Sequence, residues 1–394
     1  MCPHTLDVVS CLYPAYIYSL LMGFAPFKIE RKGPFVEIKH CKIYHVLSTL
    51  FYTLSICFLV WMGYTKMGYY HLQSPMQRFI NFLYLLLVAG LMSVNVLFNK
   101  LHTTSLVTLW RKMCHIDTLI RNRGIKLNYR RLMYSTSTFC IVAATLHTCY
   151  IIFLVSIQNY KDPLFSGSVY FALNFAVTGF ACVSCSFLAF FLLIGHMFEK
   201  ILEYMKHRVL RSFLLDSDSK SKSIIDTADL HQELCELVRH ANDVMSVQML
   251  ASFAVTFSVV TLQIYSMVNA FNIKKVDYSF VLSSLCCVII LLQEKVILSL
   301  VSRRCMGMIP KTKELLTELL NVHIDDKRIC REVNAFNLQI LHNQFDITAG
   351  NFFVIDPPIF LTAGSAITTY ILLFIQADPF VDLYQSMKDS VGAI

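Results

Sequence analysis

Charged residues are scarce in this sequence. Asp, Glu, Lys and Arg make up 15% of its 394 residues and hydrophobic residues 56%, whereas soluble domains are about a quarter charged. A single soluble core could not hide so much apolar surface, and large exposed apolar patches promote aggregation. The shortage of charge therefore excludes an ordinary soluble domain and indicates that lipid is the solvent.

The signatures of catalysis and of metal or nucleotide binding are also missing. The sequence has no Walker-type phosphate loop, no His-Glu-x-x-His pair, no Gly-x-Ser-x-Gly elbow and no dinucleotide fingerprint. The fourteen cysteines are scattered, many inside apolar runs, so they do not form a secreted disulfide framework. We expect no enzyme activity, no cofactor and no metal. The net charge of +8 does not indicate nucleic acid, because the basic residues lie in the gaps between apolar runs.

Seven charge-poor runs are long enough to cross a hydrocarbon core of ~30 Å, which takes about 20 helical residues. They lie at residues 43–65, 79–99, 132–160, 163–198, 244–273, 278–302 and 357–377. Lipid offers the backbone no hydrogen-bond partner, so such runs form helices or closed barrels, and these are too long for barrel strands. The predicted fold class is an all-α membrane protein with seven transmembrane helices. A further apolar run, residues 8–27, contains Pro14 and Pro26 and is predicted to be an interfacial or re-entrant helix.

Lys and Arg are unevenly distributed among the segments between the spans. Of 34 such residues, 27 fall in residues 28–42, 100–131, 200–239 and 303–331, and six fall in the alternate segments. Because cytosolic segments carry the excess of Lys and Arg, we predict that residues 1–42 are cytosolic and that the tail, residues 378–394, is extracellular. G-protein-coupled receptors also have seven helices, but with the opposite polarity.

The cytosolic segments are long and carry helical patterns. Residues 100–131 and 199–243 are predicted cytosolic loops, with a flexible stretch at 214–223, and residues 303–356 are predicted cytosolic helices opened in part by Asp325 and Asp326. Apolar residues recur at helical spacing at Leu230, Leu234, Leu237, Ala241, Val244, Leu315, Leu319, Val322, Ile329, Val333, Phe336 and Ile340. These stripes must be buried, either within one chain or in a bundle that also joins subunits.

Two adjacent charges interrupt the sixth span. Neighbouring residues on a helix point about 100° apart, so Glu294 and Lys295 are predicted to find partners on other helices rather than each other. They lie toward the inner end of the span and are predicted to mark the point where the helix leaves the lipid.

The last span carries a mostly polar stripe. Asp356 and two prolines open it, which suits a helix start. Residues then recur at steps of three or four along one face, at Thr362, Ser365, Thr369, Leu373 and Gln376. Polar groups inside a membrane must meet protein or water. The stripe predicts either hydrogen bonding between helices or the lining of a pore, with Leu373 as an apolar constriction.

The end of this span resembles a known family. Thr369 and Tyr370, five apolar residues and Gln376 are similar to the signature that ends the last helix of insect gustatory receptors, which are related to insect odorant receptors. Residues 349–356, which lead into the span, and residues 124–131 before the third span also resemble members of that family.

The resemblance implies a ligand-gated, non-selective cation channel in the plasma membrane of a sensory neuron. It implies a homo- or heterotetramer with other gustatory receptor subunits, held by an anchor bundle of cytosolic helices. The last helix of each subunit would line the pore with the stripe defined above, and Leu373 and Ala377 would form the gate. Ala377 departs from the family pattern, which usually has Phe at this place.

The resemblance also implies a pocket for a small-molecule tastant among the outer halves of the second to sixth spans. Depth in the membrane and residue type give the candidates Tyr84, His147, Tyr150, Asn174, Gln263, Tyr265, Asn269 and Ser283. Two other readings stay open: an odorant-receptor-like channel subunit, and a heptahelical receptor that signals through a partner without a pore of its own.

Overall fold

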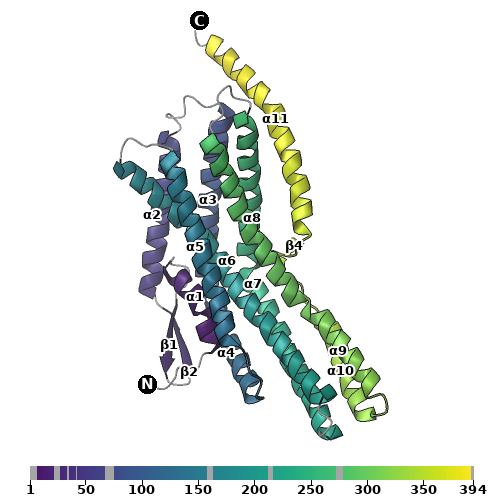
Figure 1. Cartoon of the computed structure of the whole chain (residues 1–394). Helices are drawn as coiled ribbons and strands as arrows, with labels where there is room; N and C mark the ends of the chain where they lie inside the picture. Colours follow the sequence, from purple (N-terminus) through teal and green to yellow (C-terminus); the bar gives the residue numbers. More distant parts are fainter. Residues whose placement is uncertain are drawn as a thin grey trace.

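The computed structural model of the chain describes residues 7–21, 27–32, 35–40, 42–66, 75–157, 163–211, 216–271 and 278–391, almost all of them helical (Figure 1). The helices are α1 (Val8–Leu21), α2 (Lys42–Lys66), α3 (Pro75–Leu101), α4 (Thr103–Asn122), α5 (Tyr129–Ile157), α6 (Pro163–Met205), the π-helix η2 (Lys206–Arg211), α7 (Ser217–Phe271), α8 (Tyr278–Met306), α9 (Met308–Val322), α10 (Lys327–His342) and α11 (Ile359–Val391). The described strands form two antiparallel hairpins, β1 (Phe27–Lys32) with β2 (Phe35–His40) and β3 (Thr348–Ala349) with β4 (Phe353–Val354).

Seven of these helices correspond to the predicted spans. Among the described residues, α3, α5, α6, α7, α8 and α11 each contain a stretch long and apolar enough to cross a membrane. Helix α2 overlaps the first predicted span and packs against α3. Its 25 residues reach about 37 Å at 1.5 Å per residue. The prediction of an all-α membrane fold is confirmed.

The first helix is too short to cross. The 14 residues of α1 give about 21 Å, less than the ~30 Å of hydrocarbon. Its residues Val8, Leu12 and Tyr16 are buried in the main core, and the helix packs against α5 and α6. The Tyr16 hydroxyl donates to the carbonyl of Phe27 (3.0 Å), which ties α1 to β1. The segment predicted as interfacial is therefore a short buried helix, while residues 22–26 lie outside the described part.

The long helices continue past the spans as a shared bundle. Helix α7 has 55 residues and runs about 80 Å, and the segments predicted as cytosolic loops contain α4, the end of α6 and the start of α7. The predicted flexible stretch is wrong from Ser217 on, because α7 begins there. Ser223 and Thr227 donate their hydroxyls to the carbonyls four residues earlier, so these polar side chains are accommodated inside the helix.

The apolar stripes of this bundle are buried within the chain. The stripe residues on α7 and α10, and Leu315 and Leu319 on α9, are buried, whereas Val322 is 58% exposed. Asp326 caps α10 as predicted, with its carboxylate accepting from the backbone N–H of Arg328 and Ile329. Asp326 also accepts from the Ser217 hydroxyl at 2.6 Å, which joins the start of α10 to the start of α7.

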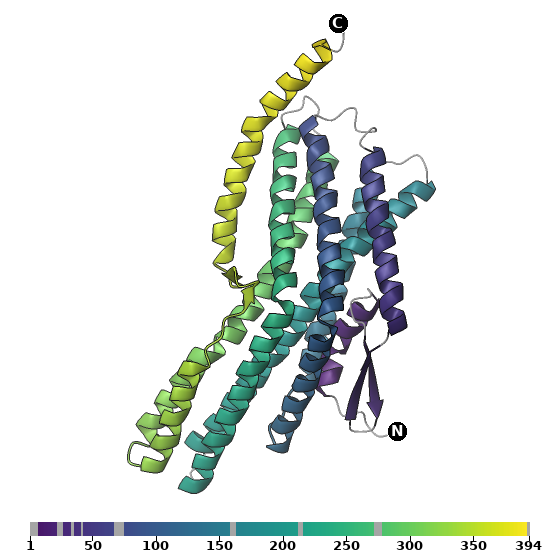
Figure 2. The same cartoon turned by 180° about the vertical axis from the view of Figure 1, so that it is seen from behind.

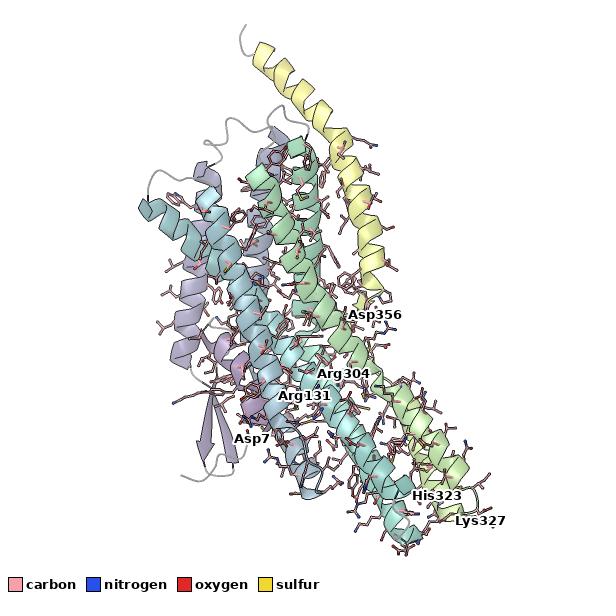
Figure 3. The ribbon with its side chains drawn as sticks, in the orientation of Figure 1. Asp7, Arg131, Arg304, His323, Lys327 and Asp356 are labelled. Atoms are coloured by element: carbon pink, nitrogen blue, oxygen red, sulfur yellow. The ribbon has the colours of Figure 1, made fainter. Side chains whose placement is uncertain are left out.

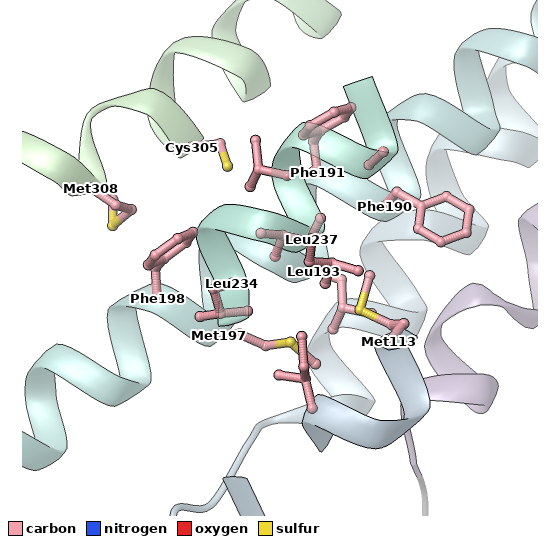
Figure 4. Close-up of a cluster of buried hydrophobic side chains, with 14 of the residues drawn as sticks. Met113, Phe190, Phe191, Leu193, Met197, Phe198, Leu234, Leu237, Cys305 and Met308 are labelled. Carbon is pink, nitrogen blue, oxygen red and sulfur yellow. The ribbon is translucent and has the colours of Figure 1, made fainter. Parts of the chain in front are cut away.

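The main core lies where this bundle meets the membrane part. Figure 4 shows Met113 of α4, Phe191 and Phe198 of α6, Leu234 of α7 and Cys305 of α8 gathered in one cluster. Each of the five is 0% exposed. Full burial of one such apolar side chain contributes about 1.5–3 kcal/mol, so this cluster fixes how the four helices cross.

The segments rich in Lys and Arg all lie at one end of the molecule, here named the basic end. The hairpin β1–β2, α4, the start of α7, α9 and α10 occupy it in both views (Figures 1 and 2). The described N-terminal segment lies toward the same end, and the C-terminal end of α11 lies at the opposite one (Figure 1). Such an arrangement fits an odd number of crossings. The side of the membrane that the basic end faces stays a prediction.

Candidate functional site

The foot of the last span is held by a tight turn. Between β3 and β4, Gly350 adopts φ +56°, and a Cβ there would lie 2.7 Å from Cδ2 of Leu250 on α7. Asn242 of α7 accepts from the backbone N–H of Thr348 (2.8 Å) and donates to the Thr348 hydroxyl (3.2 Å). Glycine is needed here both for the left-handed backbone and for the close approach to α7.

From that foot, α11 rises beside the bundle rather than inside it. Figure 3 labels Asp356 at its base, and the helix above it projects side chains toward open space. Only 6% of its 18-residue apolar span is buried inside the chain, compared with 83% for α6. Helix α11 packs against α7 and touches α3. A membrane helix so little covered by its own chain presents most of its surface to lipid or to other subunits.

The face that α11 turns to the bundle is apolar. Phe360 meets Phe257 edge-on with ring centroids 6.3 Å apart, and Phe374 meets Tyr265 in the same way at 5.6 Å. The half-buried positions follow helical spacing, at Phe360, Ala363, Ile367, Ile371 and Phe374.

The predicted polar stripe lies on the other face. Thr362, Ser365, Thr369, Leu373 and Gln376 are all exposed. Each stands two positions after a packed residue, which is about 200° of helical rotation, so the stripe points directly away from the bundle. The side chain of Ala377, the second predicted gate residue, lies outside the described part. Leu373 is 52% exposed.

A cavity lies in the membrane part, enclosed by α3, α5, α6, α7 and α8. Its volume is about 40 Å³. The walls are mostly apolar, with a few polar groups among them. The lining residues used below are Tyr84, Val88, Met92, Asn95, His147, Tyr150, Thr256, Val259 and Cys287.

Three of the eight predicted pocket residues line this cavity, and their role as a tastant pocket stays a prediction. Tyr84, His147 and Tyr150 line the cavity. Ser283 is buried on α8 but is not among the lining residues. Tyr265 lies outside the lining and forms a small buried cluster with Leu262, against which Tyr84 and Phe374 pack.

The remaining predicted pocket residues are not brought to the cavity. Gln263 and Asn269 are not among the lining residues, and the side chain of Asn174 lies outside the described part. Sequence reasoning missed Asn95 and Thr256, which do line the cavity. Asn95 could have been found as a lone amide inside an apolar run, but it lies deeper than the outer half to which the prediction was confined.

A charged cluster adjoins the cavity, and it corrects one prediction. Lys295 Nζ donates to Glu294 Oε1 at 2.9 Å, so the two adjacent charges do pair. The long, flexible lysine chain turns its ammonium back to its neighbour, although the two Cα–Cβ bonds diverge. The predicted partners on other helices are also present, because Nζ donates to Ser184 of α6 (3.1 Å) and Ser252 of α7 (2.6 Å).

The second carboxylate oxygen of this pair faces a histidine. Glu294 Oε2 lies 3.8 Å from Nε2 of His147, and both side chains are buried, with 4% and 2% exposed. His147 therefore faces the buried ion pair as well as the cavity. Its other ring nitrogen, Nδ1, lies 2.7 Å from the carbonyl of Ala143.

The comparisons with known proteins agree with this architecture. Residues 12–380 match the family described as 7tm Chemosensory receptor. The chain belongs to this family.

Among its relatives, a Drosophila melanogaster protein named gustatory receptor 28a is 22% identical to this receptor over 422 residues, covering 94% of this chain and 92% of that one. The Drosophila melanogaster gustatory receptor for bitter taste 66a is 23% identical over 181 residues, 42% of this receptor and 33% of that protein. The alignment with a third Drosophila melanogaster protein, named gustatory receptor 28b, likewise spans about a third (34%) of its length.

The fold is shared with a solved structure, that of the insect olfactory receptor OR5 from Machilis hrabei. The TM-score is 0.61 at 13% identity, and the match covers 93% of this receptor and 97% of OR5. The same match is found to OR5 in complex with eugenol. At this identity the likeness establishes the fold. The receptor is thus a multi-pass membrane chemoreceptor with the seven-helix architecture of that family.

Proposed function

We propose that this receptor is a subunit of a ligand-gated, non-selective cation channel that a small-molecule tastant opens. The carrying observation is the polar stripe of α11, which lies exposed on the face opposite the one packed on the bundle. In lipid the amide of Gln376, at the end of this stripe, would find no hydrogen-bond partner. Four subunits arranged around a common axis would bring their four stripes together around a water-filled pore.

In that tetramer, the four Gln376 side chains would each project an amide toward the permeating ions. The four Leu373 side chains would form an apolar ring that closes the pore by excluding water. Ala377 stays the second proposed gate residue. Subunit contacts have a candidate surface at the basic end, where apolar residues remain exposed at Val322 (58%), Ile324 (72%), Leu338 (60%) and Leu341 (56%). Exposed apolar surface outside the spans favours contact with another protein.

The cavity would be the tastant site, and its walls lead to the pore helix. Tyr84 lines the cavity and packs against the buried pair Leu262 and Tyr265, and Tyr265 contacts Phe374 of α11. The cavity volume of about 40 Å³ is smaller than the roughly 150 Å³ cavity that holds benzene. A tastant must therefore push the walls apart. A displacement of Tyr84 would then be transmitted to α11 through the buried pair Leu262 and Tyr265.

Adjacent threonines on α11 provide a matched test. Thr368 and Thr369 are both exposed, and both hydroxyls donate to the carbonyl four residues earlier. They point about 100° apart, and only Thr369 belongs to the stripe. We expect a charged thiol reagent to block tastant-evoked current in Thr369→Cys, and to leave Thr368→Cys no more sensitive than wild type, which itself contains fourteen cysteines. Equal block of both variants would contradict the assigned pore face.

The Gln376→Ala substitution tests the same face by permeation. We expect altered ion selectivity or block with normal surface expression. Loss of assembly with unchanged permeation would favour helix packing as the role of the stripe.

Current evoked in a cell that expresses only this chain separates a channel from a receptor that signals through a partner. An epitope at residue 1 that is reached only after permeabilisation would support the cytosolic N-terminus.

A further inference from the structure

The cavity adjoins a group of buried polar atoms that lack hydrogen-bond partners within the described part of the chain. They are Asn95 Oδ1, His147 Nε2, Thr256 Oγ1 and Glu294 Oε2. Three of the four residues line the cavity, and Glu294 joins them through its 3.8 Å approach to His147. Buried polar atoms are nearly always paired, so four in one place point to a missing partner.

These atoms share one chemical need. The carbonyl of Ala143 only accepts, so Nδ1 of His147 donates its N–H to it, and in the tautomer with one ring N–H the Nε2 atom is an acceptor. The Asn95 amide oxygen and the Glu294 carboxylate oxygen are also acceptors, and the Thr256 hydroxyl can accept or donate. The His147 and Glu294 atoms face each other at 3.8 Å with no donor between them. An ammonium about 2.8 Å from each would donate an N–H to both, and a hydroxyl would donate its single O–H to one of them.

We propose that the cavity binds a small amphiphile that carries a hydrogen-bond donor, a primary ammonium or a hydroxyl group. The donor end lies beside His147 and Glu294, and the apolar body lies against Val88, Met92 and Val259. Met92 is an unbranched side chain that repacks readily around different shapes. This inference rests on the proposed function, because it takes the cavity as the tastant site.

Recognition in this site depends on hydrogen bonds rather than on net charge. The ammonium of Lys295 neutralises Glu294 from the other side, through Oε1. The pair therefore attracts a cation weakly, while Oε2 keeps its capacity to accept. A quaternary ammonium, which has charge but no N–H, meets none of the unpaired acceptors.

Four probes that share a phenylethyl body test this directly. They are 2-phenylethylamine, 2-phenylethanol, propylbenzene and trimethyl(2-phenylethyl)ammonium, and their binding to the purified full-length receptor in lipid nanodiscs is measured by saturation-transfer NMR with titration. We expect the amine and the alcohol to bind at least roughly tenfold more tightly than the other two, since a hydrogen bond to a charged group contributes about that factor or more.

Equal binding of propylbenzene and 2-phenylethanol overturns the proposal, because ordered waters would then satisfy the acceptors permanently. Tight binding of the quaternary ammonium overturns it too, as does the binding of none of the four probes at millimolar concentration.

Two threonines on α7 supply matched variants. The Thr256 hydroxyl is one of the unpaired atoms, whereas the Thr261 hydroxyl donates to the carbonyl of Phe257 (2.8 Å) outside the cavity. Thr256→Val removes the unpaired hydroxyl but keeps the shape of the side chain. The ratio of the affinity for 2-phenylethylamine to that for propylbenzene should therefore fall several-fold. Thr261→Val should keep the wild-type ratio. An equal affinity ratio in the two variants contradicts the proposed site. His147→Phe should lower the affinity ratio further than Thr256→Val does.

Current recordings with the same probes keep the two proposals apart. Donor-selective binding without any evoked current contradicts the channel and leaves the site intact. Current evoked equally by all four probes contradicts the site and leaves the channel intact.

Discussion

Replacement of Lys295 by methionine tests how the buried charges stabilise the receptor. Lys295 is 0% exposed, and its ammonium is held by Glu294, Ser184 and Ser252. Methionine fills a similar volume but leaves the Glu294 carboxylate buried without its cation. Removal of one partner of a buried ion pair costs about 3–5 kcal/mol, so Lys295→Met should unfold the purified receptor at a lower temperature and reduce its surface expression.

The double variant Glu294→Met with Lys295→Met is the matched control. With both charges gone, no uncompensated ion remains, and a buried pair replaced by apolar residues of similar size is often neutral or more stable by about 1–4 kcal/mol. We expect the double variant to recover most of the lost thermal stability in detergent. If Lys295→Met unfolds at the wild-type temperature, or if the double variant is the less stable of the two, the ion pair does not have the role assigned to it.

Two further substitutions test the basic end and the foot of α11. Asp326→Ala removes the cap of α10 and should cost about 0.5–2 kcal/mol in thermal unfolding, whereas Asp325→Ala, beside it, should not. The Ser217 hydrogen bond lowers the pKa of Asp326, so the contribution of this cap is present above the ordinary carboxyl pKa and is lost as the pH falls through the lowered value. Gly350→Ala should cost about 1–2 kcal/mol for its left-handed backbone plus a clash with Leu250, while Gly364→Ala, whose Cβ would meet nothing within 4 Å, should be neutral or stabilising.

The predictable parts of the fold are those that follow from the local periodicity of the sequence. Charge-free length located seven spans, and spacing along the last span separated its polar face from its packed face before any contact was known. The two prolines of the run at residues 8–27 predict a segment that does not cross, but the burial of α1 depends on α5 and α6, which no local pattern reveals. The serines near residue 220 suggested a loop, yet the packing of α7 against α10 holds them in a helix.

The cavity was less predictable, because its members come from five helices whose rotations are set by tertiary packing. Tyr84, His147 and Tyr150 were found from depth and residue type alone. Gln263 and Asn269 have the same depth and type, but their positions on α7 do not face the cavity. Glu294 and Lys295 were expected not to pair because only the direction of their Cα–Cβ bonds was considered, and the reach of a lysine side chain exceeds that divergence.

The case for a water-lined axis depends on Gln376 more than on the other stripe residues. Thr369 donates its hydroxyl to the carbonyl of Ser365 within its own helix, so lipid could cover it at modest cost. The Gln376 amide is exposed near the far end of the same face, and its two N–H donors and carbonyl find nothing in hydrocarbon. The flanking faces, with Leu361 at 82% and Leu372 at 54% exposed, suit lipid or a neighbouring helix. A single chain in a bilayer would therefore leave Gln376 as the costliest group in the part of α11 whose side chains are described, and assembly around water would remove that cost.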